Sequence, residues 1–359
     1  MKKILLALLT AATLWGCGKD SPGDDPPGSN SGTKGVYIAG WAASGDDEVA
    51  ILWKDGQATK LTPTPLKKAR ALSVCVSGND VYVGGYERRI AGSYETAVLW
   101  KNGVSTSLSD NTYPYARIYS IAVSGNDVYA AGMRYKAGGK TTAVLWQNGV
   151  ATDLNAPAYS GNASAYCVRI IGSDVYVVGF INRDEQPALW KNGTWVDVAL
   201  PQGAEGAILR SVYGDGSHIW AGGKVKLGMT DDSPYLWKDG TPIRLDQTDD
   251  WLPEVYDISG MGGKIYSVGR DQYPETPNPK YSPCYWIDTK QYRLSDSHGS
   301  AESISISGND VYIAGFCRLP DEYQTYQEMA VYWKNGTQTT LKVDGKAKYS
   351  EAYGIFVVD

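Results

Sequence analysis

The chain of 359 residues is poor in histidine, phenylalanine and cysteine, and it carries no excess of positive charge. Its two histidines, His218 and His298, are too few for a His-rich metal site or for most His-based acid–base chemistry. The net charge of −5 argues against the clustered Lys and Arg of a nucleic-acid-binding surface. We therefore expect no metal, no cofactor and no nucleic-acid partner.

The N-terminal apolar run, residues 4–14, is too short to span a bilayer, which takes roughly 20 apolar residues. Lys2 and Lys3 precede it, and Gly16-Cys17 follows, so the segment resembles a bacterial lipoprotein signal, although Trp15 is larger than usual for its position. The alternative is an ordinary secretory signal with a chance cysteine. We predict a signal peptide over residues 1–16 and a lipid on Cys17.

Residues 17–34 are rich in Gly, Pro, Ser and Asp with almost nothing apolar, so they predict a flexible tether. The acidic residues soon after Cys17 resemble the export signals of surface lipoproteins in Bacteroidetes-type bacteria. The predicted location is the outer membrane, with exposure at the cell surface. Contact with the membrane would be through the lipid anchor alone.

Tyrosine, tryptophan and glycine are abundant, at 26, 12 and 41 residues, which favours many short strands joined by tight turns. Two phrases recur. SGNDVY, with weaker variants, is followed three residues later by a glycine, and LWKNG recurs with its tryptophan at intervals of 44 to 49 residues. The seven tryptophans are Trp53, Trp100, Trp146, Trp190, Trp237, Trp286 and Trp333. Periods of this length are typical of propellers, solenoids and arrays.

Two spacings inside the repeat are fixed. The small or polar residue in the strand ahead of each SGND turn lies 9 residues before the aromatic of SGNDVY. Each LWKNG tryptophan lies 8 residues before a later aliphatic residue. Segments of constant length around SGND and KNG predict β-hairpins, because the turn fixes the register. Each repeat therefore holds four strands, and residues 35–359 predict an all-β, seven-bladed β-propeller of four-stranded antiparallel blades. A linear β-solenoid is the alternative.

The ends of the repeat region complete each other. The chain enters at a VYxxG strand, Val36–Gly40, and leaves at an inner-type strand, Tyr353–Val358. We predict that the C-terminal strand pairs with the N-terminal blade and closes the ring. The two variable connections of every repeat would then share one face, the longest being residues 270–284 and 316–328. Variable loops on a rigid scaffold commonly carry function.

The order AVLWKNG followed by SIAVSGNDVYVGG resembles the bacterial extracellular repeat called HAF and uncharacterised repeat lipoproteins of gut Bacteroidetes. The resemblance covers Gly35 to Asp359, but the His-Ala-Phe opening of HAF reads Thr96-Ala97-Val98 here. It implies an extracellular location and a propeller. It implies no catalytic motif, and no phosphate loop, nucleophile elbow or Ca²⁺ loop occurs in the sequence.

The positions where repeats disagree are more informative than those where they agree. One such position directly precedes the small residue of each inner strand, and its seven occupants are Leu72, Tyr119, Tyr166, Arg210, Tyr256, Glu302 and Tyr353. Aromatic faces with polar tips suit sugars or peptides, so all but Leu72 are candidate ligand contacts, and Trp41 and Trp251, with Tyr86, Tyr113 and Tyr115, extend the surface. The alternative is that each Tyr closes the top of a seam between blades.

Two charged residues and two cysteines also stand out. Asp257 replaces a small residue of its inner strand, and Arg169 lies in another, so a watery channel or a ligand would have to stabilise them. Cys284 and Cys317 fall on one face of neighbouring blades and could form a disulfide in an oxidising compartment. Cys75 and Cys167 are expected to be buried.

These features favour a monomeric, lipid-anchored envelope protein without enzyme activity that binds glycan or peptide ligands through its variable face. A scaffold for other envelope proteins is one alternative. A polysaccharide hydrolase or lyase, with Glu302 and Asp257 as its carboxylates, is the other.

Overall fold

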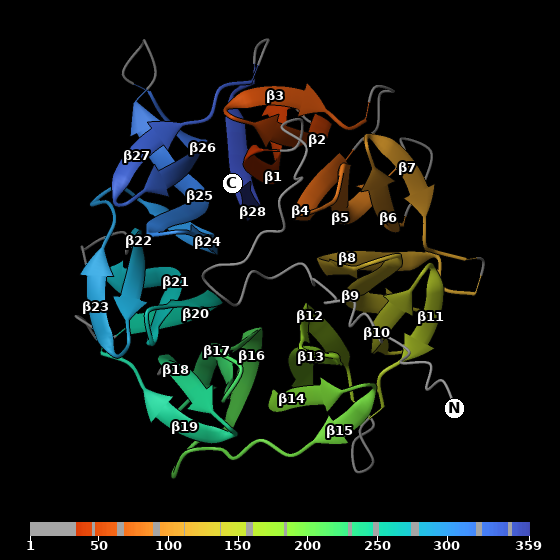
Figure 1. Ribbon diagram of the computed structural model, residues 1–359, viewed down its shortest axis with the longest axis vertical. Coiled ribbons are helices and arrows are strands. Elements are labelled where there is room, and N and C mark those ends of the chain that lie inside the picture. The colour runs from red at the N-terminus through yellow and green to blue at the C-terminus, as the bar shows by residue number, and fades with distance from the viewer. Residues whose placement is uncertain are drawn as a thin grey trace, which may run out of the picture.

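The computed structural model describes residues 34–44, 47–62, 68–88, 94–110, 112–136, 138–155, 161–182, 185–228, 232–246, 251–273, 280–320, 325–343 and 347–359. The predicted signal peptide, Cys17 and all but the last residue of the predicted tether lie outside these ranges. The described chain forms 28 strands in seven four-stranded antiparallel sheets that surround one axis (Figure 1). This is the predicted seven-bladed β-propeller. No helix able to cross a bilayer is found in the described part.

The strands of the first four blades, from the innermost strand outward, have the following bounds. They are β28 (Tyr349–Val358), β1 (Gly35–Ser44), β2 (Asp47–Lys54) and β3 (Gln57–Lys60); β4 (Lys68–Ser77), β5 (Asp80–Arg88), β6 (Thr96–Lys101) and β7 (Val104–Ser107); β8 (Tyr115–Ser124), β9 (Asp127–Tyr135), β10 (Thr141–Gln147) and β11 (Val150–Asp153); β12 (Ala163–Ile171), β13 (Asp174–Ile181), β14 (Gln186–Lys191) and β15 (Thr194–Val196).

The last three blades follow the same order. They are β16 (Gly206–Gly214), β17 (Ile219–Lys226), β18 (Asp232–Lys238) and β19 (Thr241–Arg244); β20 (Trp251–Met261), β21 (Lys264–Tyr273), β22 (Lys280–Ile287) and β23 (Lys290–Arg293); β24 (Gly299–Ser307), β25 (Asp310–Pro320), β26 (Tyr326–Lys334) and β27 (Thr337–Thr340).

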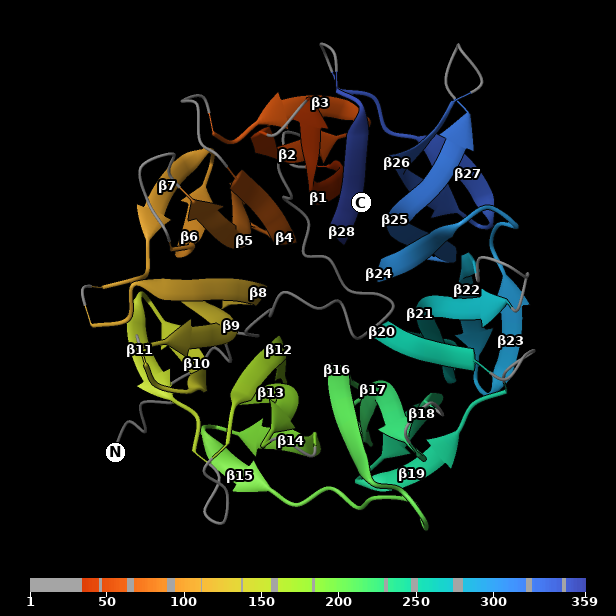
Figure 2. The same cartoon turned by 180° about the vertical axis from the view of Figure 1, so that it is seen from behind.

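The C-terminal strand closes the ring, as predicted. β28 pairs antiparallel with β1 from Gly35↔Val358 to Ala43↔Tyr349, so the two ends of the chain form one blade. Seven inner strands, β28, β4, β8, β12, β16, β20 and β24, surround the central axis (Figure 2). No sheet edge is left between the first and last strands, because each now has a partner.

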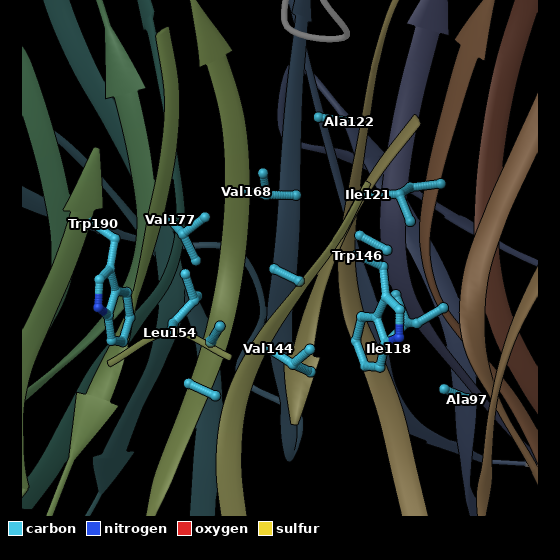
Figure 3. Close-up of a cluster of buried hydrophobic side chains, with 14 of the residues drawn as sticks. Ala97, Ile118, Ile121, Ala122, Val144, Trp146, Leu154, Val168, Val177 and Trp190 are labelled. Carbon is cyan, nitrogen blue, oxygen red and sulfur yellow. The ribbon is translucent and has the colours of Figure 1, made fainter. Parts of the chain in front are cut away.

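The repeat tryptophans form the packing between blades. All seven are at most 1% exposed. Figure 3 shows two of them, Trp146 and Trp190, among aliphatic side chains that include Ile118 and Leu154. The indole N–H of Trp190 donates to the Asn155 carbonyl of the preceding blade at 3.0 Å. Trp53, Trp237 and Trp286 make the same contact with the blade before each of them. The LWKNG tryptophan therefore joins neighbouring blades as well as filling the core.

The antiparallel order places the tight turns on one face and the variable connections on the other. Two of the predicted long loops are mostly strand. β21 and β22 stay paired from Tyr266↔Ile287 to Tyr273↔Lys280, and β25 and β26 continue to Pro320↔Tyr326. The sequence spacing could not show this, because a hairpin extended beyond the sheet has the same length as a loop. Blades 6 and 7 therefore rise above the variable face as ribbons.

The disulfide that the sequence left open does not form, since Cys284 and Cys317 are both free and buried. Cys284 lies in a hydrophobic cluster with Val255 and Trp286, whereas Cys317 lies in a different cluster with Ala301. Each thiol belongs to the packing of its own seam between blades, so the two side chains do not meet. Cys167 is a buried free thiol, as expected, whereas Cys75 is buried but disulfide-bonded.

Candidate functional site

All seven positions singled out on the inner strands are β-bulge residues. In each blade the pairing with the second strand skips one residue, as at Ile118↔Gly132 followed by Ser120↔Ala131, which leaves Tyr119 unpaired. The skipped residues are Leu72, Tyr119, Tyr166, Arg210, Tyr256, Glu302 and Tyr353. A bulge re-aims a side chain without ending the strand. We call these residues the bulge ring.

The bulge explains the glycine of every VYxxG strand. A Cβ on Gly132 would lie 1.9 Å from the Arg117 carbonyl oxygen, and a Cβ on Gly85 would lie 2.0 Å from the Arg70 carbonyl oxygen. The same approach, at 1.9–2.0 Å, occurs at Gly40, Gly179, Gly223, Gly269 and Gly315. These glycines leave room for the inner strand of their own blade.

The bulge ring lines a single axial cavity of about 140 Å³. All seven residues are partly exposed. Four are tyrosines, and the Tyr119 and Tyr166 ring centroids lie 5.2 Å apart. The sequence left open whether these tyrosines line the channel or close the seams between blades. They do the first, because all four belong to the cavity wall.

Directly below the bulge ring, small polar residues join one blade to the next. The Ser73 hydroxyl accepts the Ile121 N–H at 3.2 Å, and the Ser120 hydroxyl accepts the Val168 N–H at 3.2 Å. Ser303 accepts the Ile355 N–H in the same way, at 3.4 Å. This belt bridges inner strands, which have no ladder hydrogen bonds to one another.

Asp257 is the charged member of the belt, and hydrogen bonds hold both of its oxygens. Oδ1 accepts from the Ser211 hydroxyl at 2.7 Å and from the Ile258 N–H at 3.0 Å. Oδ2 accepts from the Ser303 hydroxyl at 2.9 Å and from the Ile304 N–H at 3.0 Å. The carboxylate thus ties together three consecutive blades. Neither a watery channel nor a ligand is needed to account for it.

Arg169 completes this arrangement. Its Nη2 lies 3.5 Å from Asp257 Oδ1, although Arg169 belongs to β12 and Asp257 to β20, two blades further round the ring. The two charges that looked anomalous in the sequence therefore neutralise each other across the channel. Pairing of this kind makes buried charges tolerable.

Above the bulge ring, arginines stack on aromatic rings and pair with glutamates of the neighbouring blade. The Arg70 guanidinium lies 4.1 Å from the Trp41 ring centroid, and its Nη2 donates to Glu48 Oε1 at 3.0 Å. Arg117 lies over the Tyr86 ring at 4.7 Å and pairs with Glu95. Stacking and pairing together fix these arginines in place.

The third pair of this kind includes a bulge-ring residue. Arg210 donates from Nε to Glu254 Oε1 at 2.7 Å and lies over the Tyr166 ring at 4.2 Å. Burial alone would raise the pKa of Glu254, but the Arg210 and Lys224 charges hold that pKa below its usual range. Arg210 is therefore held by its ion pair with Glu254 and by its stacking on Tyr166.

Glu302 has a different environment. Burial, with smaller effects from the charges of Glu351 and Glu254, raises the pKa of its carboxyl to about 7, against the opposing effects of a hydrogen bond with Ser300 and the charge of Arg270. Glu351 lies one blade further on, with its pKa also raised by burial. It accepts hydrogen bonds from the Tyr353 hydroxyl and, at 3.2 Å, from the Trp41 indole. Two glutamates thus lie where blades 7 and 1 meet, and of these two Glu302 lines the cavity.

The predicted site residues are only partly brought together. Tyr119, Tyr166, Arg210, Tyr256, Glu302 and Tyr353 share the cavity. The prediction that Trp41 and Tyr86 lie in variable loops is wrong, because both lie within strands and are buried. Trp251 begins β20, but its side chain is outside the part that the structure describes.

The sequence reasoning missed the upper layer of Arg70, Arg117, Glu48, Glu95 and Glu254. One signal was available, because Arg70, Arg117 and Glu254 each precede the bulge position by two residues. Within the described residues, no group of three or more His, Cys, Asp or Glu side chains could hold a metal ion.

Solved structures with a similar fold are β-propellers. A puromycin-hydrolysing peptidase from Mycobacterium tuberculosis aligns over 85% of this chain and 53% of its own, with 12% identity and a TM-score of 0.49. TolB from Acinetobacter baumannii aligns over 91% and 67%, with 9% identity and a TM-score of 0.46. The β-propeller domain of the Trilobed protease from Pyrococcus furiosus aligns over 86% and 99%, with 12% identity and a TM-score of 0.46.

This chain spans about half the length of the mycobacterial peptidase. At such low identities the likeness concerns the fold alone. No family model and no curated protein matches the sequence. The resemblance to HAF repeats therefore gains no support from a family match, whereas the propeller architecture stands on the structure itself.

Proposed function

We propose that this chain is a non-enzymatic binding protein of the cell envelope that holds a glycan or peptide ligand on its variable face. The bulge ring is the observation that carries the proposal. An almost uniform scaffold of seven blades presents seven partly exposed side chains of four different types to one cavity. Variation at a single scaffold position is typical of recognition.

The size of the cavity limits how a ligand can bind. About 140 Å³ is small beside the roughly 300–1,000 Å³ of pockets that enclose a whole small molecule. The cavity would therefore hold one protruding group of a larger ligand. The rest of that ligand would lie on the variable face, where Tyr94, Tyr326 and Tyr349 of three consecutive blades are exposed.

Glycan and peptide arrays probed with the purified full-length protein test this function. We expect a ligand whose affinity falls about tenfold or more in the double variant Tyr166→Ala, Tyr256→Ala, because two aromatic contacts are lost. The matched control is Tyr285→Ala, Tyr292→Ala, which removes a stacked pair from outer strands β22 and β23. The proposal fails if no ligand is found, or if both double variants bind like the wild type.

The two alternatives give different results. A scaffold would co-purify with envelope proteins and bind no isolated ligand. A hydrolase acting through Glu302 and Asp257 is disfavoured, because four hydrogen bonds occupy the Asp257 oxygens. Hydrolysis of any polysaccharide that is lost in Glu302→Gln would replace the binding role with an enzymatic one.

The lipid anchor is part of the proposal and rests on the sequence around Cys17. Metabolic labelling with a palmitate analogue in a Gram-negative host should mark the wild type and not Cys17→Ser. Equal labelling of the two proteins would exclude this anchor.

A further inference from the structure

The charged residues that line the cavity are not equally paired. They are Arg169, Arg210, Asp257 and Glu302. Arg169 pairs with Asp257, and Arg210 pairs with Glu254. Glu302 has no ion pair within 4.0 Å among the residues that the structure describes. The cavity therefore presents one acidic group without a direct counter-ion.

An aromatic ring stands beside this carboxylate. Tyr353 occupies the bulge position next to that of Glu302, on the neighbouring blade. Its hydroxyl donates to Glu351 and accepts from Arg70 Nη1 at 3.4 Å, which fixes the ring in place. A carboxylate beside an aromatic face is a favourable environment for a cation. Anionic groups are disfavoured there by the same charge.

The shape of the cavity favours a slender group. On blade 7 it is lined by consecutive residues from Glu302 to Ile306, roughly 13 Å of strand. A volume of about 140 Å³ spread over that length is narrow. Glu302 lies at the end nearer the variable face, below the extended ribbon of β25 and β26. A flexible chain fits such a space better than a sugar ring.

We propose that the cavity binds a cationic side chain of a peptide, a lysine in the simplest case, with its ammonium group against Glu302 and Tyr353. This inference rests on the proposed binding function and names the ligand class. The peptide backbone lies on the variable face, and the alkyl stem passes between the tyrosines of the bulge ring. The site is neutralised when the ammonium group arrives.

The inference has a pH signature. Charged and titratable groups facing Glu302 are Arg270 of β21, Glu254 and Tyr256 of β20, and Glu351 and Tyr353 of β28. With a pKa of about 7, the Glu302 carboxyl is mostly neutral at pH 6 and mostly ionised at pH 8. The ionised fraction rises about tenfold over that interval, while a lysine amine stays charged. Binding should therefore strengthen as the pH rises.

The experiment compares the pentapeptide acetyl-Gly-Ser-Lys-Ser-Gly-amide with its Nε-acetyl-lysine form, by calorimetry on the full-length protein. We expect acetylation to weaken binding at least tenfold, and Glu302→Gln to remove both this preference and the tenfold gain from pH 6 to pH 8. The control Asp296→Asn makes the same carboxylate-to-amide change at a side chain that is 88% exposed. It should behave like the wild type.

Each other outcome is decisive. Equal affinity for the two peptides, or an unchanged preference in Glu302→Gln, overturns the cation inference. The proposed function still stands in that case if a ligand found on the arrays no longer binds the Tyr166→Ala, Tyr256→Ala double variant. A chitosan trimer that binds through Glu302 when the peptide does not would place the amine on a sugar and overturn the peptide assignment. Failure of both probes overturns the inference.

Discussion

At the residue scale, the repeat glycine and the bulge residue depend on each other. The bulge brings an inner-strand carbonyl to within 2.0 Å of where any Cβ on the paired glycine would lie. The glycine is thus a steric requirement of the bulge. It does not serve a turn conformation, since none of the seven glycines of the VYxxG strands has a positive φ. One glycine per blade therefore maintains one cavity-lining side chain per blade.

Gly132→Ala tests this dependence. The added methyl would meet the Arg117 carbonyl oxygen at 1.9 Å, so the bulge must shift, and we expect a loss of about 2–3 kcal/mol in the free energy of unfolding. Urea denaturation measures it. Gly103→Ala is the comparison, because no atom lies within 4 Å and only its φ of +81° opposes a side chain, at a cost of about 1 kcal/mol. Equal losses for the two variants would contradict the steric explanation.

The sequence located the bulge ring but not the bulges. Disagreement among repeats pointed to Tyr119, Glu302 and the other ring members, because positions without a packing role are free to differ. The bulge itself could not be recognised from the sequence. Every repeat carries the extra residue that forms it, so the spacing between the repeat phrases stays constant. The sequence did not show that Trp41 is buried, because the Arg70 side chain that stacks on its ring comes from the next blade.

At the element scale, the two tight turns of each blade lie side by side and are linked. In every blade the side chain of the Asn or Asp in the KNG-type turn accepts the N–H of the residue just before the VY-type aromatic, at 2.8–3.1 Å. Four of these turn residues are Asn, and each also donates to the Asp of its SGND-type turn, as Asn102 does to Asp80 at 2.7 Å.

Where the KNG-type turn carries Asp, no Asp stands opposite. Asp239 meets His218 at 2.6 Å, and Asp55 and Asp288 lie in blades with Gly35 and Lys264 at that position. The reason is hydrogen-bond complementarity, since two carboxylates have no proton to share. This covariation is visible in the sequence and could have shown that the two turns touch.

Asn102→Asp should lower the midpoint of thermal unfolding, because the new carboxylate still accepts the Val81 N–H but faces Asp80 without a donor. The second change Asp80→His should restore much of the loss by recreating the His218–Asp239 pair. Calorimetric scans at pH 7 measure both. A single variant as stable as the wild type, or a double variant worse than the single, would contradict the pairing rule.

At the scale of the whole molecule, the strand that closes the ring comes from the far end of the chain. β28 supplies the inner strand of the first blade, contributes Tyr353 to the bulge ring and donates a hydrogen bond of the polar belt, from the Ile355 N–H to the Ser303 hydroxyl. Repeat arithmetic was enough to predict this, because the two leftover strands complete one blade. The contact between Arg169 and Asp257 was beyond prediction, since it joins blades that are neither sequential nor adjacent.

Deleting residues 354–359 should abolish soluble expression or cost several kcal/mol, because half of a ladder and its packing are lost together. Soluble yield and urea unfolding measure the effect. Adding a synthetic peptide of residues 349–359 to the truncated protein should recover stability in proportion to peptide concentration. A truncated protein that unfolds like the wild type would show that the ring does not depend on β28.

The unpaired state of the bulge ring has an evolutionary consequence. Because no ladder hydrogen bond depends on which of these side chains is present, substitutions there can accumulate while the fold persists. Seven such positions surround one axis, and only those with a side-chain partner, such as Arg210 with Glu254, need a matching second change. Paralogues could diverge in specificity by exchanging these residues alone, and an engineer could randomise them to select new binders.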